Sequence, residues 1–248
     1  MTELDGVPAG ELARRWGVPR CDLYPTLGST LDAVHQLGGA GAPPGSTVIA
    51  AEQTAGRGRA GRTWHSPVGG VWLGLLVRPP GAALGAAAIR AGLALADAVD
   101  ALLGRAATRL KWPNDVLLGD RKLGGILCEA RWQGDALQWL AVGVGVNVAN
   151  PLPGAVARPA VALREWLPGV RRIDLLDRVV PALAGAAAGR AALTDLECAA
   201  FTARDWLRGR ALRAPAPGLA RGVRADGALL VESAAGTLAV REGHVELA

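Results

Sequence analysis

Lysine is nearly missing from this sequence of 248 residues. Only Lys111 and Lys122 occur among 27 basic residues, whereas alanine, arginine, glycine and proline are abundant. Lysine carries a compact, rotatable point charge, and arginine carries a wide planar fork. A general bias that replaces lysine by arginine has therefore spared two sites, which we interpret as places where the fork does not fit. Chance survival of both lysines is the alternative.

Cysteine and long apolar runs are also scarce. The three cysteines stand far apart without a CxxC motif, and the three histidines share no metal-ligand spacing, which argues against a disulfide framework and a metal site. No apolar run reaches the roughly 18–20 residues that a membrane span requires, and the N-terminus has no apolar signal-peptide core. We therefore expect a cytoplasmic protein without a membrane partner.

The charge balance points to an anionic partner. The formal net charge is +5 and the pI is near 9.8. Such a surface suits a nucleotide, a nucleic acid or an acidic protein, and the charge alone leaves these three open.

Acidic residues are missing between Glu52 and Asp97, a region that begins with an informative loop. Residues 51–65, AEQTAGRGRAGRTWH, contain the pattern G-x-G-x-x-G of dinucleotide-binding folds. Such folds place a helix after the glycines and an acidic residue about twenty positions later. Here TWHSPVGGVW follows, with Pro and paired Gly, and residues 53–96 contain no Asp or Glu. The sequence therefore argues against a dinucleotide fold, and it contains no GxxxxGK[ST] phosphate loop.

What remains is a loop that is both flexible and positive. Arg57, Arg59 and Arg62 lie within six residues and repel one another, so we expect the loop to be mobile when it is empty. Ordering it costs about 1–2 kcal/mol per residue, which an anionic ligand can offset through charge-assisted hydrogen bonds. Trp64 and Trp72 add flat apolar surface beside the charge. A solvated linker is the alternative, and it leaves the tryptophans unexplained.

The hydrophobic patterns predict an α/β fold. We expect strands at 46–52, 71–78, 122–132 and 136–148, with turns at Gly119-Asp120 and Gly134-Asp135. Helices are expected at 9–17, after the cap Gly28-Ser29-Thr30, and at 82–103, 173–189 and 194–207. Pro181 should kink or split the helix at 173–189. Short β runs follow from about residue 209, with a hairpin at Asp226-Gly227, so we expect an α/β domain, 1–207, and a β domain, 208–248.

The two lysines lie in one polar region. Lys111-Trp-Pro-Asn-Asp115 places a cation, an indole, a fixed proline φ and two polar side chains where a strand meets a turn. Lys122 follows Asp115 by seven residues, and Gly124 and Gly125 allow backbone to approach a ligand closely. If the flanking strands are neighbours, both lysines can point into one cleft that faces the arginine loop. Such a cleft gathers phosphate and carboxylate charge for nucleotidyl transfer, although KWPND alone is equally typical of an ordinary turn.

Five motifs taken together resemble those of the biotin protein ligases. They are GST at 28–30, AEQTAGRGRAGRTW at 51–64, KWPND at 111–115, RKLGGIL at 121–127 and GVGVN at 143–147. The similarity covers about residues 28–150, and the β tail resembles the SH3-like C-terminal β-barrel of that family. The resemblance implies a mixed β-sheet backed by helices, as in class II aminoacyl-tRNA synthetases. It also implies biotin, ATP and magnesium as ligands, with the magnesium bound as MgATP.

The same resemblance implies a role for individual residues. Ser29, Thr30 and Gln53 match contacts to the biotin head, and Lys122 matches the lysine that meets the biotin carboxyl and the α-phosphate. The catalytic group implied by the resemblance is Lys122, Lys111, Asp115 and Arg59. Further implied biotin contacts are Arg57, Gly58, Arg59 and Gly125, and the implied nucleotide contacts are Arg57, Arg59, Arg62, Trp64, Asn114 and Asn147.

The implied reaction has two steps. Biotin's carboxylate attacks the α-phosphate of ATP, and a lysine of a biotin carboxyl carrier protein then attacks the biotinyl-adenylate. Many relatives begin with a winged helix-turn-helix, for which the 28 residues before Ser29 are too few. We therefore expect no repressor function and no DNA partner, in a monomer or a weak homodimer. Leu31 stands where some relatives have a polar residue, so a ligand contact there is not implied.

Two rival functions are also considered. A lipoate or octanoate attachment enzyme shares this architecture but is expected to lack GRGRxGRxW. A nucleic-acid-binding module is expected to spread basic residues along one face and to lose affinity steeply with salt. Here the informative residues concentrate in one pocket, which favours the ligase.

Overall fold

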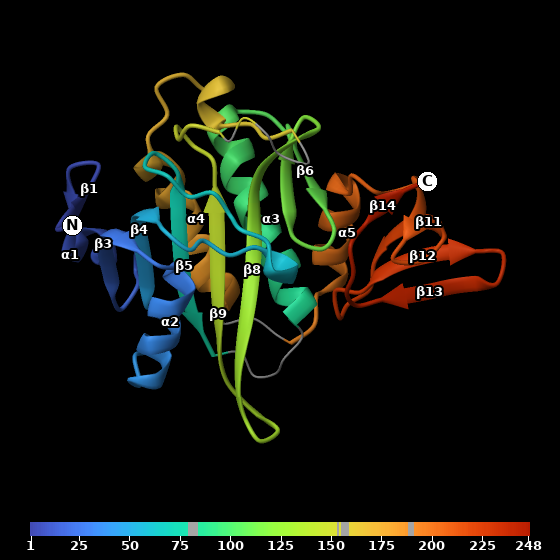
Figure 1. The fold of residues 1–248 in the computed structure, drawn as a ribbon, viewed down its shortest axis with the longest axis horizontal. Coiled ribbons are helices and arrows are strands. Elements are labelled where there is room, and N and C mark those ends of the chain that lie inside the picture. Colours follow the sequence, from blue (N-terminus) through green and yellow to red (C-terminus); the bar gives the residue numbers. More distant parts are fainter. Residues whose placement is uncertain (79–83, 153, 155–158, 188–190) are drawn as a thin grey trace.

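The computed structural model describes residues 1–78, 84–152, 154, 159–187 and 191–248 (Figure 1). Their main body is a mixed sheet with helices on both faces, and a smaller sheet near the C-terminus lies beside it (Figure 1). No helix in these ranges combines the length and the apolar composition that crossing a membrane requires.

The main sheet joins strands from residues 21–146 in the order β3-β4-β5-β9-β8-β7-β6. Their bounds are β3 (Cys21–Leu27), β4 (Thr47–Gln53), β5 (Val71–Val77), β6 (Thr108–Lys111), β7 (Asp115–Leu118), β8 (Arg121–Gln133) and β9 (Ala136–Val146). β3 and β4 run parallel, and the other neighbouring pairs are antiparallel. The expected mixed sheet is therefore confirmed, as are the strands expected at 46–52, 71–78, 122–132 and 136–148.

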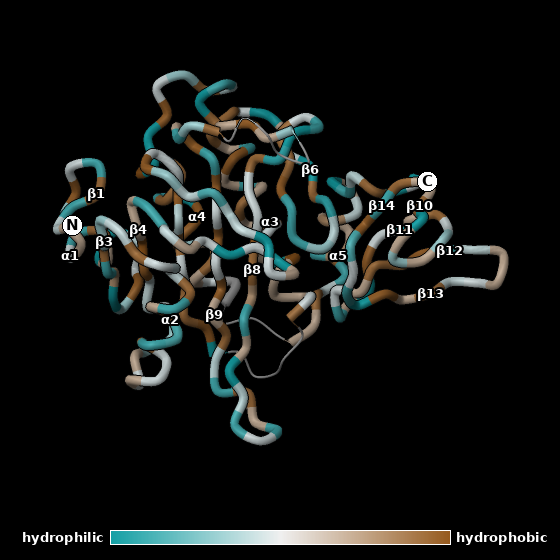
Figure 2. The backbone as a smooth tube through the Cα atoms, viewed as in Figure 1, coloured by the Kyte–Doolittle hydropathy of each residue, from teal (hydrophilic) through white to brown (hydrophobic). Residues whose placement is uncertain are grey.

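β9 shows why the two faces of this sheet differ. Val142, Val144 and Val146 belong to the large hydrophobic core, and Gly143 and Gly145 alternate with them. Because successive side chains of a strand point to opposite faces, one face of β9 carries valine and the other is bare at two positions. Most of β9 is hydrophobic (Figure 2). Its bare face contributes to the candidate site.

Helices cover both faces of the sheet (Figure 1). The bounds are α1 (Ala9–Trp16), α2 (Thr30–Gly39), α3 (Leu84–Leu103), α4 (Arg172–Ala187) and α5 (Asp195–Arg204), with 3₁₀ turns η1 (Arg59–Gly61) and η2 (Leu163–Glu165). α2 packs with Val48 of β4 in a small core, whereas α3 and α4 share the large core with the adjacent Ile49. Since neighbouring residues of a strand face opposite ways, α2 lies on one side of the sheet and α3 and α4 on the other.

The helix boundaries follow the predicted signals. Ser29 caps α2 by accepting a hydrogen bond from the Leu31 N–H, and Gly17 ends α1 in the left-handed conformation with φ 66°. Pro181 lies inside α4, which continues through it. The expectation that Pro181 splits the helix is therefore wrong, and the alternative, a kink, stays a prediction. Residues 82, 83, 188 and 189 of the expected helices lie outside the described residues.

β3 is a strand that the sequence patterns did not reveal. It contains Pro25, and proline within a strand cannot donate a hydrogen bond to a neighbour. β3 forms an edge of the sheet and pairs only with β4 in the described chain. An edge position tolerates proline, so Pro25 concealed a real strand.

The C-terminal residues form the second sheet. Its strands are β10 (Ala211–Ala214), β11 (Gly218–Val223), β12 (Leu229–Ser233), β13 (Gly236–Val240) and β14 (Glu246–Leu247), in the order β13-β12-β11-β10-β14. A short hairpin, β1 (Glu3–Leu4) and β2 (Val7–Pro8), stands at the other end of the chain. Gly227 has φ 83° in the turn between β11 and β12, which confirms the hairpin expected at Asp226-Gly227.

That turn joins the two sheets. The buried Trp112 indole N–H donates a hydrogen bond to the Gly227 carbonyl at 2.9 Å. A Cβ at Gly227 would lie 2.3 Å from the carbonyl carbon of Gly85 at the start of α3, so only glycine fits this contact. The C-terminal sheet is thus held against the KWPND segment, which carries Lys111 and Asp115.

Candidate active site

The floor of the candidate site is a patch of glycines on the α2 face of the sheet. Gly74 pairs with Gly143 across β5 and β9, and Gly125 pairs with Gly145 across β8 and β9. We call these four residues the glycine floor. A Cβ at Gly143 would meet Leu31 of α2 at 3.1 Å, and a Cβ at Gly74 would meet Val34 at 2.7 Å. The missing side chains therefore let other groups approach the sheet closely.

A preformed polar cluster stands at one end of the floor. The Gln53 Oε1 atom accepts hydrogen bonds from the Thr30 N–H at 2.8 Å and from its hydroxyl at 3.1 Å. The Gln53 Nε2 atom donates to Ser66 Oγ at 2.9 Å, and Ser29 is buried beside Thr30 at the start of α2. Ser29, Thr30 and Gln53, which the sequence grouped together, are thus close in space.

The arginine loop crosses above the floor and holds itself together through its backbone. The Trp64 N–H donates to the Gly56 carbonyl at 2.8 Å, and the Gly58 N–H donates to the Arg62 carbonyl at 2.7 Å. A Cβ at Gly56 would lie 2.4 Å from the Trp64 carbonyl oxygen, so glycine is required there. We name residues 56–64 the strap. Its expected mobility in the empty enzyme stays a prediction.

Trp64 places its indole on the glycine floor. A Cβ at Gly145 would be 2.6 Å from the Trp64 Nε1 atom, and one at Gly125 would be 3.6 Å from its ring. The Nε1 atom is buried and has no hydrogen-bond partner among the described residues. A buried indole N–H usually finds an acceptor, so this donor is available to a ligand that enters beneath the strap.

Lys122 and Asp115 form an ion pair next to Trp64. Their Nζ and Oδ1 atoms are 2.6 Å apart, and Nζ also lies 4.8 Å from the centre of the Trp64 ring. A register shift between β7 and β8 follows Val116, which lets Lys122 reach back to Asp115. Both side chains are largely buried, so the charges interact more strongly than they would in water.

Lys111 lies on the strand next to Asp115. It is the direct cross-strand partner of Asp115 in β6 and β7, and it is buried. Its Nζ atom lies 4.8 Å from the centre of the Trp206 ring, and Trp206 donates to Asp120 at 2.8 Å. The ammonium groups of Lys111 and Lys122 thus rest on different tryptophans, and their expected convergence on one cleft stays a prediction.

The three arginines of the strap have different surroundings. Arg57 binds the carboxylates of Glu129 and Asp32. Arg59 is half-buried, and burial lowers its pKa while the nearby Asp115 carboxylate opposes that change. Arg62 is exposed and donates to the Arg59 carbonyl at 3.3 Å. Of the three, Arg59 carries its charge toward the Lys122–Asp115 pair.

The two asparagines make contacts within the protein. The Asn114 side chain donates from Nδ2 to the Ile126 carbonyl at 2.8 Å, and the backbone carbonyl of Asn114 accepts the Ile126 N–H at 2.9 Å. Asn147 is buried and accepts from Asn150 on Oδ1 at 3.1 Å. These bonds fix the ends of β7 and β9 beside the glycine floor, and any contact of the asparagines with a nucleotide stays a prediction.

Sequence reasoning did not select Glu129, Asp32, His35 or Trp206. Strand periodicity offers a signal for Glu129, because residues 125, 127 and 129 of β8 share one face. Gly125 on that face had already been singled out, so Glu129 belonged with it. Asp32 and Trp206 approach through tertiary packing, for which the local sequence has no signal.

Residues 26–147 match the Biotin/lipoate A/B protein ligase family. Over these residues the chain is similar to that family. The chain is also 46% identical over 145 residues to the biotin--[acetyl-CoA-carboxylase] ligase of Paracoccus denitrificans, covering 55% of this chain. The match spans 60% of that relative's own length. The residues matched by the family model include the strap, the KWPND segment and the glycine floor.

Solved structures extend the likeness beyond residues 26–147. The biotin protein ligase from Aquifex aeolicus in complex with biotin and ATP has a TM-score of 0.75 at 23% identity, over 93% of this chain and 99% of that one. The Leishmania major biotin protein ligase in complex with biotinyl-5-AMP has a TM-score of 0.63 at 26% identity, over 90% and 98%. The first likeness shows a shared fold, which confirms the predicted fold class.

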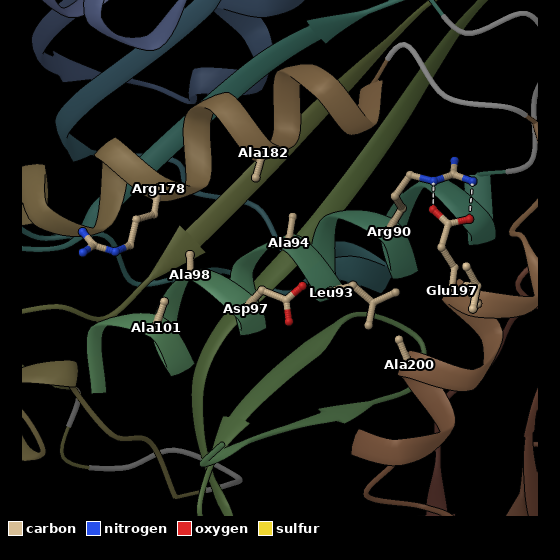
Figure 3. Close-up of a pocket in the computed structure, with 11 residues that line it drawn as sticks. Arg90, Leu93, Ala94, Asp97, Ala98, Ala101, Arg178, Ala182, Glu197 and Ala200 are labelled. Carbon is tan, nitrogen blue, oxygen red and sulfur yellow. Dashed lines mark hydrogen bonds and ion pairs between the residues drawn. The ribbon is translucent and has the colours of Figure 1, made fainter. Parts of the chain in front are cut away.

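A groove outside the candidate site lies between α3, α4 and α5 (Figure 3). Five of its eleven lining residues are alanine, and the Arg90–Glu197 ion pair stands at one end (Figure 3). α3 and α4 cover the face of the sheet opposite to α2, so this groove does not open onto the glycine floor.

Proposed function

We propose that this chain is a biotin protein ligase that works in two half-reactions. In the first, a carboxylate oxygen of biotin attacks the α-phosphorus of MgATP, the bond to the bridging oxygen breaks, and pyrophosphate leaves. In the second, the ε-amine of an acceptor lysine attacks the biotinyl carbonyl, AMP leaves, and the amine loses a proton to solvent. Magnesium enters as part of the nucleotide substrate.

The observation that carries this proposal is the position of Lys122. Its ammonium lies beside the glycine floor, against the Trp64 ring of the strap and next to Asp115. Two anions must meet in the first half-reaction, and a cation at their junction offsets the repulsion. Fixed geometry can contribute up to about 7–11 kcal/mol to such an encounter.

The glycine floor and the polar cluster suit a flat, partly apolar head group. We propose that the biotin ring system lies on Gly125 and Gly145, where Trp64 rests in the structure, and that Ser29, Thr30 and Gln53 bind its polar edge. Gly58 and the strap arginines would then cover the adenylate. A closed strap excludes water, which would otherwise hydrolyse the mixed anhydride.

The other assigned residues surround the nucleotide in this proposal. Lys111 and Asp115 lie near the phosphates, and Arg59 neutralises charge that develops there. Arg62, Trp64, Asn114 and Asn147 are assigned to the nucleotide by family resemblance. The assignment of Trp64 is supported by its contact with Lys122. The assignment of the two asparagines is supported by the hydrogen bonds with which they order the strand ends.

We further propose that the acceptor is a lysine of a biotin carboxyl carrier protein in an acyl-CoA carboxylase, as the Paracoccus relative's name suggests. The reaction would take place in the cytoplasm, in a monomer or a weak homodimer. The proposal includes no repressor activity. We also propose the division 1–207 and 208–248, which falls between α5 and β10.

The deciding experiment supplies MgATP and labelled biotin, with and without a carboxyl carrier domain. We expect biotin-dependent exchange of pyrophosphate into ATP, and transfer of label to the carrier. Parallel reactions with lipoate and octanoate test the other branch of the family. Absence of exchange with biotin, or faster exchange with lipoate, would reject the proposed substrate.

A further inference from the structure

The Arg57 side chain does not point at Lys122. Its Nε and Nη2 atoms donate to the two oxygens of Glu129, each at 3.1 Å, and its Nη1 atom donates to Asp32 at 2.7 Å. Paired bonds between a guanidinium and a carboxylate fix direction as well as distance. A phosphate that approached Arg57 would have to displace two carboxylates that already neutralise it.

Glu129 is itself held in place by a short chain of hydrogen bonds. The Trp139 indole N–H, which can only donate, lies 3.1 Å from His35 Nδ1, so that atom accepts. The proton of the neutral His35 ring is then on Nε2, which lies 3.1 Å from Glu129 Oε2. The hydrogen bond from His35, joined by those from Arg57, holds the pKa of Glu129 below its usual range. Glu129 is therefore a fixed carboxylate.

Trp139 is fixed in turn by α2. A Cβ at Gly38 would lie 2.5 Å from the Trp139 ring, so the indole packs directly on the helix backbone. Asp32 and His35 belong to the same helix. The group around Arg57 thus joins the strap to α2, β8 and β9, none of which is part of the strap.

The strap is consequently attached at two places along β8. Trp64 rests at Gly125, and Arg57 is bound at Glu129, four residues further along the same face. Four strand residues span about 13 Å, so the two attachments hold the strap at well-separated points. Arg59 lies between Arg57 and Trp64 in sequence and forms no ion pair within the described part of the chain.

We propose that Glu129 is a positioning residue, which anchors the strap through Arg57 with help from Asp32 and His35. This inference rests on the proposed ligase function, and it gives Arg57 and Arg59 different roles. Arg57 holds the strap over the floor, whereas Arg59 keeps its charge for the activated phosphate. Loss of the anchor therefore affects retention of the adenylate more than its synthesis.

The test uses the full chain with Glu129→Gln, which removes the charge and keeps the shape. We expect trypsin to cut the native protein after the strap arginines about tenfold faster, because one charge-assisted anchor is lost. We also expect about tenfold more biotinyl-adenylate to escape into solution per turnover, with a smaller fall in pyrophosphate exchange. A variant with both Arg57→Gln and Glu129→Gln should be no worse than either alone, since the two residues act as one unit.

The matched control is Glu232→Gln, which removes the carboxylate partner of Arg221 on the C-terminal sheet and should change neither readout. If Glu129→Gln does not fold, Asp32→Asn replaces it, because Asp32 is on the exposed side of α2. Unchanged strap cleavage in a folded variant overturns the anchor. If the unmodified chain shows no exchange with biotin, the proposed function fails, while the cleavage result still judges the anchor by itself.

Discussion

The Nζ atom of Lys122 lies 2.6 Å from the Oδ1 atom of Asp115. Without a ligand, the ammonium is therefore neutralised by a carboxylate of the protein. In the proposed reaction, the biotin carboxylate and the α-phosphate must share Lys122 with Asp115 or displace Asp115, which makes the small size and rotatable donors of lysine important. This pairing gives a physical reason for the retention of lysine in a chain that uses arginine almost everywhere else.

We expect Lys122→Arg to abolish adenylate formation although it keeps the charge. The planar fork needs more room than the space between Asp115 and the Trp64 ring provides. Loss of one well-placed donor typically lowers turnover by about 100-fold or more. Biotin-dependent pyrophosphate exchange measures the effect, and Arg121→Lys is the control because Arg121 pairs with Glu165 at the surface. Full activity of Lys122→Arg would contradict the assignment of Lys122.

We expect Gly145→Ala to weaken biotin binding, because its Cβ would enter the floor where Trp64 rests at 2.6 Å. Such overpacking costs about 1–3 kcal/mol, so the dissociation constant for biotin should rise by about tenfold or more. Calorimetry of biotin binding measures the change. Gly39→Ala is the matched control, because a Cβ there meets nothing within 4 Å. Equal affinity in both variants would show that biotin does not lie on Gly145.

Much of the fold could be predicted from local patterns. The alternation of valine and glycine in β9 identifies a strand with one bare face, and the Ser29 cap marks the start of α2. β3 was missed because an edge strand tolerates Pro25, and edge position is a property of the whole sheet. The unbroken helix around Pro181 likewise depends on packing that the sequence does not display.

The sequence predicted which residues belong to the site better than it predicted which side chains bind one another. The grouping of Ser29, Thr30 and Gln53 came from family resemblance. In the structure Thr30 is hydrogen-bonded to Gln53, and Ser29 is the residue next to Thr30 in the chain. The Arg57 partners were unforeseen, because Glu129 is 72 residues away and reaches the strap only through the register of β8. Charge patterning predicted cations near an anion, but it could not tell which arginine was already neutralised.

We expect Arg59→Ala to release the intermediate while adenylate synthesis continues. Arg59 is half-buried near Asp115 and Glu242, so its removal withdraws the charge that holds the phosphate of the bound adenylate, while Arg57 still anchors the strap. Filtration after a single turnover separates free from bound biotinyl-adenylate, and the free fraction should rise several-fold. Arg131→Ala, an exposed change at the end of β8, serves as the control. If the Arg59→Ala variant retains as much biotinyl-adenylate as the unmodified chain, Arg59 does not hold the adenylate in the site.

We expect Asp205→Asn to weaken the dependence of stability on pH. Asp205 is 7% exposed, its Oδ2 atom has no hydrogen-bond partner among the described residues, and burial raises its pKa to about 6. A carboxyl whose pKa is raised by folding favours the folded state at low pH, and this contribution is lost as the pH rises through about 6. Between about pH 7.5 and pH 5, Asp205 should therefore add roughly 1.4 kcal/mol to the free energy of unfolding.

Urea unfolding of both proteins at the two pH values isolates this effect, because asparagine cannot ionise and can still accept the Leu207 N–H, which Asp205 Oδ1 binds at 2.8 Å. The stability gained on acidification should be smaller in Asp205→Asn by about 1 kcal/mol. Asp135→Asn, at the exposed turn between β8 and β9, should behave like the unmodified chain. An equal gain in Asp205→Asn would mean that Asp205 is ionised in the folded protein at both pH values, and its buried Oδ2 would then need a cation or a water molecule that neutralises or solvates it.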